Sequence, residues 1–222
     1  MAVRYVLFDI DDTLFPSTEF AELARKNAIR AMIDMGLKQN PERLYRKLLL
    51  IIKRKGSNYE SHFDMLCKSL KVPKPARFIA AAIAAYHNTK MSMQPYPGVG
   101  SMLIGLKEGG YGLYVATDGT TIKQWDKLIR MRIALYFDDV FVSEEMGAGK
   151  ENGLFRKVLR TLGAKPEECL MVGDREDADI LPAKALGMRT VKVMQGKRAR
   201  ASTAAEFRIR DISQLPSVLK RL

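Results

Sequence analysis

Two kinds of hydrophobic periodicity divide this chain. From residue 17 to about 94, apolar side chains recur at helical spacing, without strand-like alternation. The pattern predicts four consecutive helices. The first stops at Gly36, and the second begins at the cap residue Asn40. A capping-box pattern over residues 57–60 opens the third, and the fourth follows Pro75. Four helices in a row favour one compact bundle.

The same spacing predicts which side chains of these helices turn inward, because residues three and four positions apart share a helix face. We expect the bundle core to contain Phe20, Leu23, Ala24, Ala28, Ala31, Met35, Leu44, Leu48, Ile51, Tyr59, Phe63, Leu66, Leu70, Phe78, Ile79, Ala82, Ile83 and Tyr86.

Short apolar strands alternate with helical segments in the rest of the chain, an order typical of parallel βαβ units. The sequence predicts an α/β fold: a Rossmann-like, doubly wound parallel sheet core formed by residues 1–16 and 95–222, with a helical bundle inserted at 17–94 as a lid. The predicted strands are 4–8, Leu113–Ala116, Val140–Val142, Cys169–Val172, Thr190–Val193 and Phe207–Ile209, with helices at about 99–108, 121–131, 151–162 and 178–186.

Composition narrows the class of protein. The chain has 222 residues, is 47% hydrophobic and carries a formal net charge of +12. This charge fits an anionic substrate, a nucleic-acid surface or a choice unrelated to binding. Basic clusters such as Lys53–Lys55 and Lys197–Arg200 have no aromatic stripe beside them, so nucleic-acid binding is not expected as the main function. No apolar run reaches the roughly 20 residues of a membrane span, so we expect no membrane association and a cytoplasmic protein.

Two acidic residues follow the first predicted strand. Asp9 and Asp11 stand two positions apart, directly after the apolar residues 5–8, so their side chains share one face of an extended segment. Open α/β sheets place their chemistry at this end of the strands. Two adjacent carboxylates need a neutralising cation or a shared proton, and both occur in metal-assisted phosphoryl transfer. The pair therefore predicts that chemistry.

Three more polar groups follow later strands, and a doubly wound sheet brings such strand ends into one crevice. The groups supply a hydroxyl for a phosphate oxygen, a fixed positive charge and carboxylates for a hard cation. They are Thr117-Asp118-Gly119, Lys150, and Gly173-Asp174 with Asp177 and Asp179.

In this order, the DxDxT motif from Asp9, the threonine at 117, the lysine at 150 and the GDxxxxD motif from Gly173 resemble the haloacid dehalogenase (HAD) superfamily of Mg-dependent phosphohydrolases. The similarity covers essentially the whole chain. The helical insertion resembles the superfamily's helical C1-type cap. The segments Ala116–Gly119 and Gly173–Arg175 are similar to its archaeal Mg-dependent small-molecule phosphatases.

The resemblance implies a role for each motif residue. Asp9 would be the nucleophile that forms an aspartyl-phosphate, and Asp11 the general acid and base. Thr117 would hold a phosphoryl oxygen, and Lys150 would balance the charge between nucleophile and phosphate. Mg²⁺ would bind the carboxylates of Asp9 and Asp174 and the backbone carbonyl of Asp11.

Other residues would support the site. Thr13 would fix the loop through its hydroxyl, and Asp179 would orient Lys150 or a metal-bound water. Asp118 either caps the following helix or contacts substrate. Arg175 is a further substrate-binding candidate, in addition to Thr117 and Lys150. Asp12 is expected to be a turn residue, and Asp177 either an additional supporting acid or a helix-start carboxylate.

Lys150 departs from the family pattern, because Glu151 follows it where the family usually has proline. The expected loop is less rigid, and a surface lysine is the alternative. If Lys150 is catalytic, Lys150→Ala is expected to abolish turnover with little loss of fold.

Asp11 disfavours a dehalogenase, because halide displacement at carbon needs no acid and the family's dehalogenases lack that aspartate. A phosphatase acting on a small-molecule phosphate ester is the main prediction, and a phosphomutase stays open because it shares all four motifs. A non-catalytic nucleic-acid-binding protein is the remaining alternative. The sequence identifies neither the ester nor the oligomeric state, for which a homodimer stays open.

Overall fold

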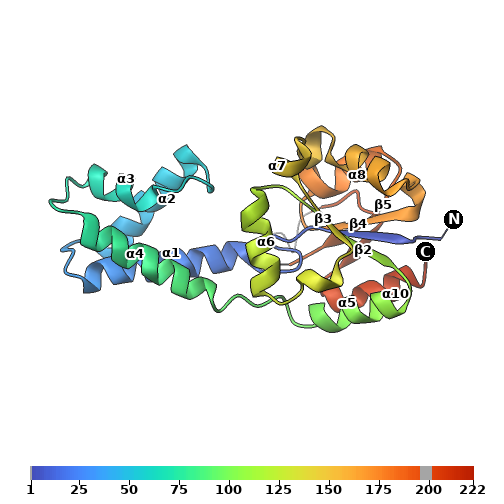
Figure 1. Ribbon diagram of the computed structural model, residues 1–222, viewed down its shortest axis with the longest axis horizontal. Helices are drawn as coiled ribbons and strands as arrows, with labels where there is room; N and C mark the ends of the chain where they lie inside the picture. Colours follow the sequence, from blue (N-terminus) through green and yellow to red (C-terminus); the bar gives the residue numbers. More distant parts are fainter. Residues whose placement is uncertain (1, 196–201) are drawn as a thin grey trace. The chain divides into compact units, whose positions relative to one another are not determined.

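The computed structural model describes residues 2–195 and 202–222 (Figure 1). The described chain divides into two compact units. One contains the chain through Ser17 together with Gln94 and all that follows, and the other is Thr18–Met93. The predicted basic cluster Lys197–Arg200 lies outside the described residues. None of the described helices is both long and apolar enough to cross a membrane.

A parallel sheet organises the first unit, and its six strands within the described residues have the order β3-β2-β1-β4-β5-β6. From the central β1 the chain moves to β2 and β3 on one side, then to β4, β5 and β6 on the other. This reversal is the switch point of a doubly wound sheet, and it confirms the predicted α/β fold. The strands are β1 (Tyr5–Phe8), β2 (Gly112–Thr117), β3 (Asp139–Val142), β4 (Cys169–Gly173), β5 (Arg189–Val193) and β6 (Phe207–Ile209).

Helices cover both faces of this sheet: Figure 1 shows α5 and α10 on one face and α8 on the other. The helices of this unit are α5 (Val99–Glu108), α6 (Thr121–Arg130), α7 (Ser143–Met146), α8 (Leu154–Leu162), α9 (Leu181–Ala185) and α10 (Leu215–Leu219).

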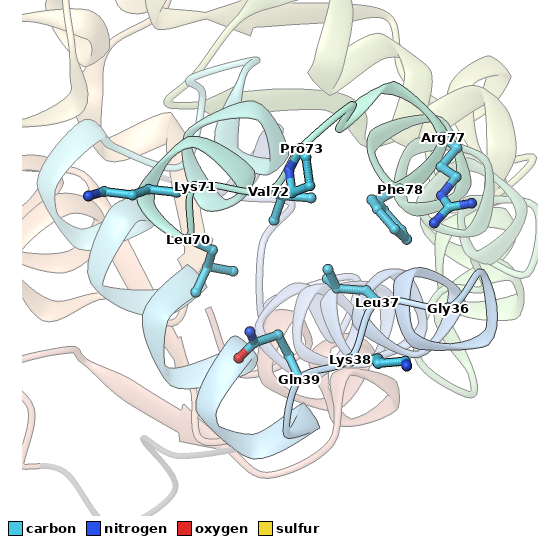
Figure 2. Close-up of a pocket in the computed structure, with 10 residues that line it drawn as sticks. All are labelled: Gly36, Leu37, Lys38, Gln39, Leu70, Lys71, Val72, Pro73, Arg77 and Phe78. Carbon is cyan, nitrogen blue, oxygen red and sulfur yellow. The ribbon is translucent and has the colours of Figure 1, made fainter.

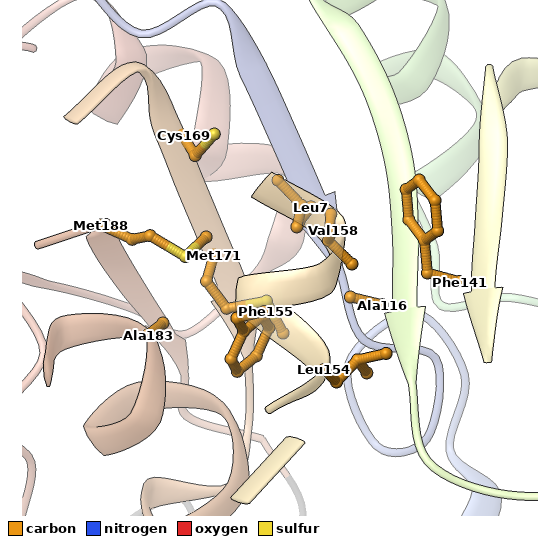
Figure 3. Close-up of a cluster of buried hydrophobic side chains, with 10 residues drawn as sticks. All are labelled: Leu7, Ala116, Phe141, Leu154, Phe155, Val158, Cys169, Met171, Ala183 and Met188. Atoms are coloured by element: carbon orange, nitrogen blue, oxygen red, sulfur yellow. The ribbon is translucent and has the colours of Figure 1, made fainter. Parts of the chain in front are cut away.

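The apolar core between the sheet and α8 fixes the position of β1 (Figure 3). Phe155 and Val158 of α8 belong to the same buried cluster as Leu7 of β1 and Met171 of β4. Leu7 and Met171 are partners in the strand register, and both are fully buried. Burying an apolar side chain of this size stabilises the fold by roughly 1.5–3 kcal/mol. The strand that leads into Asp9 is therefore held rigidly.

Two helices of this unit differ from the prediction. The helix expected at 151–162 begins only at Leu154, after a 3-10 turn at Lys150–Asn152. Gly153 between them has a φ of 123°, which no helix accommodates. The helix expected at 178–186 is a π-helical turn at Glu176–Ile180 followed by α9.

The second unit is a bundle whose helices are α1 (Ser17–Asp34), α2 (Pro41–Lys55), α3 (His62–Ser69) and α4 (Ala76–Lys90). Its core includes Leu44 and Leu48 from α2, Leu66 from α3 and Phe78 from α4. These positions follow the apolar spacing of the sequence.

Three details of the bundle correct the sequence prediction. The buried face of α1 is built around Ala28 and Met32, whereas Leu23 and Met35 are about half exposed. The capping box over 57–60 does not open α3, which begins at His62. Ile83 on α4 and Tyr59 are also exposed.

Residues 57–61 instead form a loop beside α3. The ring nitrogen Nε2 of His62 lies 2.9 Å from the backbone oxygen of Gly56. The rings of Tyr59 and His62 meet edge to face, with centroids 5.4 Å apart. His62, the first residue of α3, therefore contacts both Tyr59 of this loop and Gly56 before it.

A hollow of about 270 Å³ opens in the helical unit (Figure 2). The side chains of Leu37, Leu70 and Phe78 point into it, and those of Lys38 and Lys71 point away. None of the motif carboxylates lines this hollow, so it is separate from the candidate site described below.

The capped start of α2 offers a test of the bundle. Asn40 Oδ1 accepts a hydrogen bond from the amide of Arg43 at 3.0 Å, whereas Ser61, before α3, makes no side-chain cap. We expect Asn40→Ala to lower the free energy of unfolding by about 1 kcal/mol, because an amide loses its partner. The matched change Ser61→Ala should cost less than about 0.5 kcal/mol. Denaturant melts followed by circular dichroism measure both values, and equal losses would contradict the assignment.

Candidate active site

The carboxyl ends of β1, β2 and β4 bring the predicted motif residues together. Asp9 directly follows β1, Thr117 ends β2, and Asp174 directly follows β4. Since β1 pairs with both β2 and β4, these three strand ends are adjacent. The amide of Asp9 donates to the carbonyl of Val172 at 2.9 Å, which extends the sheet ladder to the first aspartate. All three motif side chains are buried.

Lys150 connects two carboxylates at the centre of the site. Its Nζ lies 2.5 Å from Asp9 Oδ1 and 2.6 Å from Asp179 Oδ1. The exposed fractions of the three side chains are 3% for Lys150, 7% for Asp9 and 0% for Asp179. Lys150 is therefore a buried cation between two buried acids, and not the surface lysine that the sequence left open.

This burial corrects the expectation that Lys150→Ala would leave the fold intact. Removing the ammonium would strand the carboxylates of Asp9 and Asp179 inside the protein, a change that typically costs roughly 3–5 kcal/mol. The loop is also less loose than the missing proline suggested. The amide of Gly149 donates to Asn152 Oδ1, and the amide of Lys150 donates to Asp118 Oδ1 at 3.1 Å.

The charges of this cluster shift its protonation equilibria. Burial raises the pKa of Asp9 to about 7, Lys150 opposes that rise, and the charges of Asp179 and Asp11 add to it. For Lys150, burial lowers the pKa, but the adjacent carboxylates of Asp179 and Asp9 outweigh burial and raise its pKa above the usual value. The single ammonium therefore stays charged and compensates Asp9 only in part.

The remaining charge fits a divalent cation. Carboxylate oxygens of Asp9, Asp174 and Asp179 lie within 4.8 Å of one another, and all three residues are buried. Hard cations such as Mg²⁺ prefer oxygen ligands of this kind. The two oxygens of Asp179 already accept hydrogen bonds, one from Lys150 Nζ and one from the amide of Arg175 at 2.8 Å. This leaves Asp9 and Asp174 as the better placed pair of carboxylates for a cation.

The carboxylate of Asp11 lies in a different environment from that of Asp9. Both of its oxygens accept hydrogen bonds from Lys127 Nζ on α6, at 2.6 and 2.7 Å. The side chain of Asp11 is 36% exposed, compared with 7% for Asp9. The two aspartates of the motif therefore have separate lysine partners.

Asp118 stabilises the loop of Lys150 and does not cap α6. Its Oδ1 accepts the amide of Lys150, while the residue at the start of α6, Thr120, has no side-chain cap. The backbone carbonyl of Asp118 accepts Gln124 Nε2 at 2.6 Å, and the same nitrogen lies 3.4 Å from Asp11 Oδ2. Asp118 thus links β2, α6 and the loop of the central lysine.

The two threonines of the motifs are buried. The Thr117 hydroxyl makes a long hydrogen bond of 3.5 Å to the carbonyl of Asp118. The Thr13 hydroxyl has no hydrogen-bond partner within the described residues, so it does not fix the loop as expected. Backbone bonds to the carbonyl of Ile10 from residues 13–15 hold that loop instead.

Other acidic and basic residues near the strand ends are more exposed. Arg175 Nη2 lies 2.6 Å from Asp177 Oδ2 and 3.4 Å from Glu151 Oε1. Asp177 is directed to this ion pair, which lowers its pKa, and not to the cluster around Lys150. Asp12 lies in a turn with a φ of 58°, as expected of a turn residue, and its carboxylate accepts Ser17 Oγ at 3.1 Å.

Gly173 allows Asp179 to approach the end of β4. A Cβ atom at position 173 would overlap the carboxylate and Cβ of Asp179. Position 173 of the GDxxxxD motif therefore requires glycine on steric grounds, because a side chain there would collide with Asp179, the acid that contacts Lys150.

Two site residues were missed by the sequence reasoning, Gln124 and Lys127 on α6. Gln124 is buried, and Lys127 lies three positions further along the same face of α6. The available signal was a pair of polar residues at helical spacing within the predicted helix that follows the threonine motif.

The sequence matches the haloacid dehalogenase-like hydrolase family over residues 6–193. It is 47% identical over 199 residues to the glyceraldehyde 3-phosphate phosphatase of Methanopyrus kandleri, covering 88% of this chain and 85% of the relative. It is 44% identical over 224 residues to the glyceraldehyde 3-phosphate phosphatase of Methanocaldococcus jannaschii, covering 99% of this chain and 98% of the relative.

The fold is also similar to that of solved HAD hydrolases. YfnB of Bacillus subtilis, in a crystal structure bound to magnesium, superposes with a TM-score of 0.70 and 21% sequence identity over 99% of both chains. At this identity the likeness supports the fold alone.

The relatives confirm the enzyme class predicted from the motifs, a phosphoric monoester hydrolase. The match extends over most of the chain, from β1 through β5, and includes every motif at the strand ends. The chain therefore belongs to the haloacid dehalogenase-like hydrolase family.

Proposed function

We propose that this chain hydrolyses a small phosphorylated metabolite through an aspartyl-phosphate on Asp9, with Mg²⁺ as cofactor. The observation that carries the proposal is the buried cluster of Asp9, Lys150 and Asp179, in which one fixed ammonium contacts the first aspartate of the motif. Burying three charged side chains costs free energy. A fixed ammonium beside the first aspartate can offset that cost by stabilising the negative charge of a phosphoryl group during transfer.

In this mechanism an oxygen of Asp9 attacks phosphorus, and the bond to the leaving oxygen breaks. Asp11 gives its proton to that leaving oxygen, then takes a proton from the water that hydrolyses the aspartyl-phosphate. Lys150 neutralises charge between Asp9 and the phosphoryl group, and Thr117 donates its hydroxyl to a phosphoryl oxygen. Asp179 holds Lys150 in position. Asp118 and Arg175 are the proposed contacts to the rest of the substrate.

Asp9 and Asp174, with the backbone carbonyl of Asp11, would hold Mg²⁺. When bound, this ion supplies positive charge to the phosphoryl oxygens and favours the ionised form of the nucleophile. The raised pKa of Asp9 supports this requirement, because Lys150 alone does not return the carboxyl group to its ordinary range.

The substrate proposal rests on the relatives. Glyceraldehyde 3-phosphate is the substrate in the names of two phosphatases that are 47% and 44% identical to this chain. We propose the same ester here. The helical unit, Thr18–Met93, is proposed to act as a cap that selects the substrate. The two crossings of the chain into that unit are tied together, since the amide of Tyr96 donates to the carbonyl of Leu14 at 2.8 Å.

The nucleophile is tested by Asp9→Asn. We expect phosphate release from glyceraldehyde 3-phosphate to fall by roughly 10³-fold or more, because the amide oxygen is a poor nucleophile. Acid quenching followed by mass spectrometry should find a phosphoryl adduct on Asp9 of the wild type and none in the variant. Asp12→Asn is the matched control, and it should keep near-normal activity because Asp12 serves a turn.

An active Asp9→Asn variant would refute the proposed nucleophile. A phosphomutase would instead convert sugar monophosphates into isomers with little release of phosphate, so chromatography of the same reactions separates the two activities.

The cation site is tested by thermal unfolding of chelator-treated protein. We expect added MgCl₂ to stabilise the wild type, by about 2.7 kcal/mol at a concentration 100 times the Kd. Asp174→Asn should remove this stabilisation, because it removes a buried ligand. Asp177→Asn should retain it, since Asp177 is paired with Arg175 at the surface. An Asp174→Asn variant that responds to MgCl₂ like the wild type would exclude Asp174 as a ligand.

Gly173 offers a steric test of the same site. Gly173→Ala should displace Asp179, loosen Lys150 and lower phosphatase activity by roughly tenfold or more, because a misplaced catalytic group is costly. Gly105→Ala is the control, since no atom lies within 4 Å of its added Cβ and it sits in α5. It should keep activity and gain up to about 1 kcal/mol of stability. Equal activity of both variants would show that the close approach at Gly173 is unimportant.

A further inference from the structure

The ion pair between Lys127 and Asp11 joins parts of the chain that are distant in sequence. Lys127 lies on α6 and Asp11 follows β1, 116 positions earlier. One ammonium contacts both oxygens of the carboxylate, at 2.6 and 2.7 Å. The side chains are 20% and 36% exposed, so the pair is partly shielded from water. Partial shielding strengthens such a contact relative to a fully exposed pair.

A second donor on α6 reaches the same carboxylate. Gln124 is 3% exposed, and its Nε2 lies 3.4 Å from Asp11 Oδ2 and 2.6 Å from the carbonyl of Asp118. Lys127 is one helical turn further along, on the same face. In contrast, Arg130 on α6 pairs with Asp126 of its own helix at 2.7 Å. Lys127 therefore contacts an acid of the motif, whereas Arg130 pairs within its own helix.

The chemistry at Asp11 gives this contact a function. As Asp9 bonds to phosphorus, the bond from phosphorus to the leaving oxygen breaks, and its electron pair goes to that oxygen. The proton of the Asp11 carboxyl group moves to the same oxygen, and Asp11 becomes a carboxylate. An ammonium held against both carboxylate oxygens stabilises the charge that develops there. It also restricts the rotamers from which the proton can be delivered.

We infer that Lys127 is the positioning residue of the general acid: it orients the Asp11 carboxyl group and stabilises the carboxylate left by proton donation. The inference rests on the proposed function, in which Asp11 protonates the leaving group. The inference predicts that loss of Lys127 affects some esters more than others. Lys127 matters most for esters whose leaving oxygen is strongly basic and requires a proton, and least for esters whose leaving group departs readily as an anion.

Two esters of nearly the same shape test this selectivity, phenyl phosphate and 4-nitrophenyl phosphate, of which only the first has a strongly basic leaving oxygen. The measured quantity is kcat/KM, which covers the steps through departure of the leaving group. Lys127→Met should lower kcat/KM for phenyl phosphate by roughly tenfold more than for 4-nitrophenyl phosphate. Lys127→Arg should restore most of the loss, because it keeps a cation at the site. Arg130→Met is the matched control and should change neither value, since its partner is Asp126.

Asp11→Asn provides the reference for a lost acid. It should show the same selectivity as Lys127→Met, and the double variant should be no slower on phenyl phosphate than Asp11→Asn alone, because both changes remove one function. The inference would be overturned, and the proposed function left standing, by the following pair of results. Lys127→Met loses activity equally on both esters, while Asp11→Asn still loses more on phenyl phosphate than on 4-nitrophenyl phosphate. Wild-type protein that releases phosphate from neither ester nor from glyceraldehyde 3-phosphate would overturn both.

Discussion

The buried contact of Lys150 with Asp9 and Asp179 is the interaction on which the rest of the site depends. The Lys150 ammonium contacts the carboxylates of Asp9 and Asp179, and an oxygen of a third buried carboxylate, Asp174, lies within 4.8 Å of oxygens of both acids. Charges taken out of water are costly unless they are paired, so the surrounding chain has to place each partner closely. Burial raises the pKa of Asp9, and the charge of Lys150 opposes that rise. The close carboxylate oxygens of Asp9 and Asp174 are the kind of ligands that a hard divalent cation prefers.

The sheet meets this demand through its topology. Asp9 directly follows the central strand β1. Of its two neighbours, β2 ends at Thr117 and β4 is directly followed by Asp174. Helical insertion after β1 does not disturb this register, because β1 is fixed by its buried contacts with the strands and with α8. Gly173 then allows the chain after β4 to bring Asp179 against Lys150. The cluster therefore depends on the adjacent ends of β1 and β4 and on the lack of a side chain at Gly173.

The sequence revealed what local periodicity and motif spacing determine. All six strands lie where short apolar runs predicted them, and the cap residue Asn40 is in place. Features that depend on tertiary contacts were not predictable. On α1 the predicted Ala24 and Ala28 are buried, but Met32 is buried where Leu23 and Met35 were expected. The start of α3 at His62 was likewise not predicted. Similarly, nothing local to Lys150 indicated its burial, which depends on acids 141 and 29 positions away.

The contact of Lys127 with Asp11 is another tertiary contact that the sequence does not predict. A lysine on an exposed-looking helix is usually a solvated residue, and only the fold places it 2.6 Å from Asp11. The result is a division between the two aspartates of one motif. Asp9 is buried and shares Lys150 with Asp179, whereas Asp11 is partly exposed and pairs with Lys127. Two chemically identical side chains can perform different steps only if their surroundings differ. Lys150 beside Asp9 and Lys127 of α6 beside Asp11 supply that difference. The surroundings of the two aspartates are therefore set by residues outside their motif.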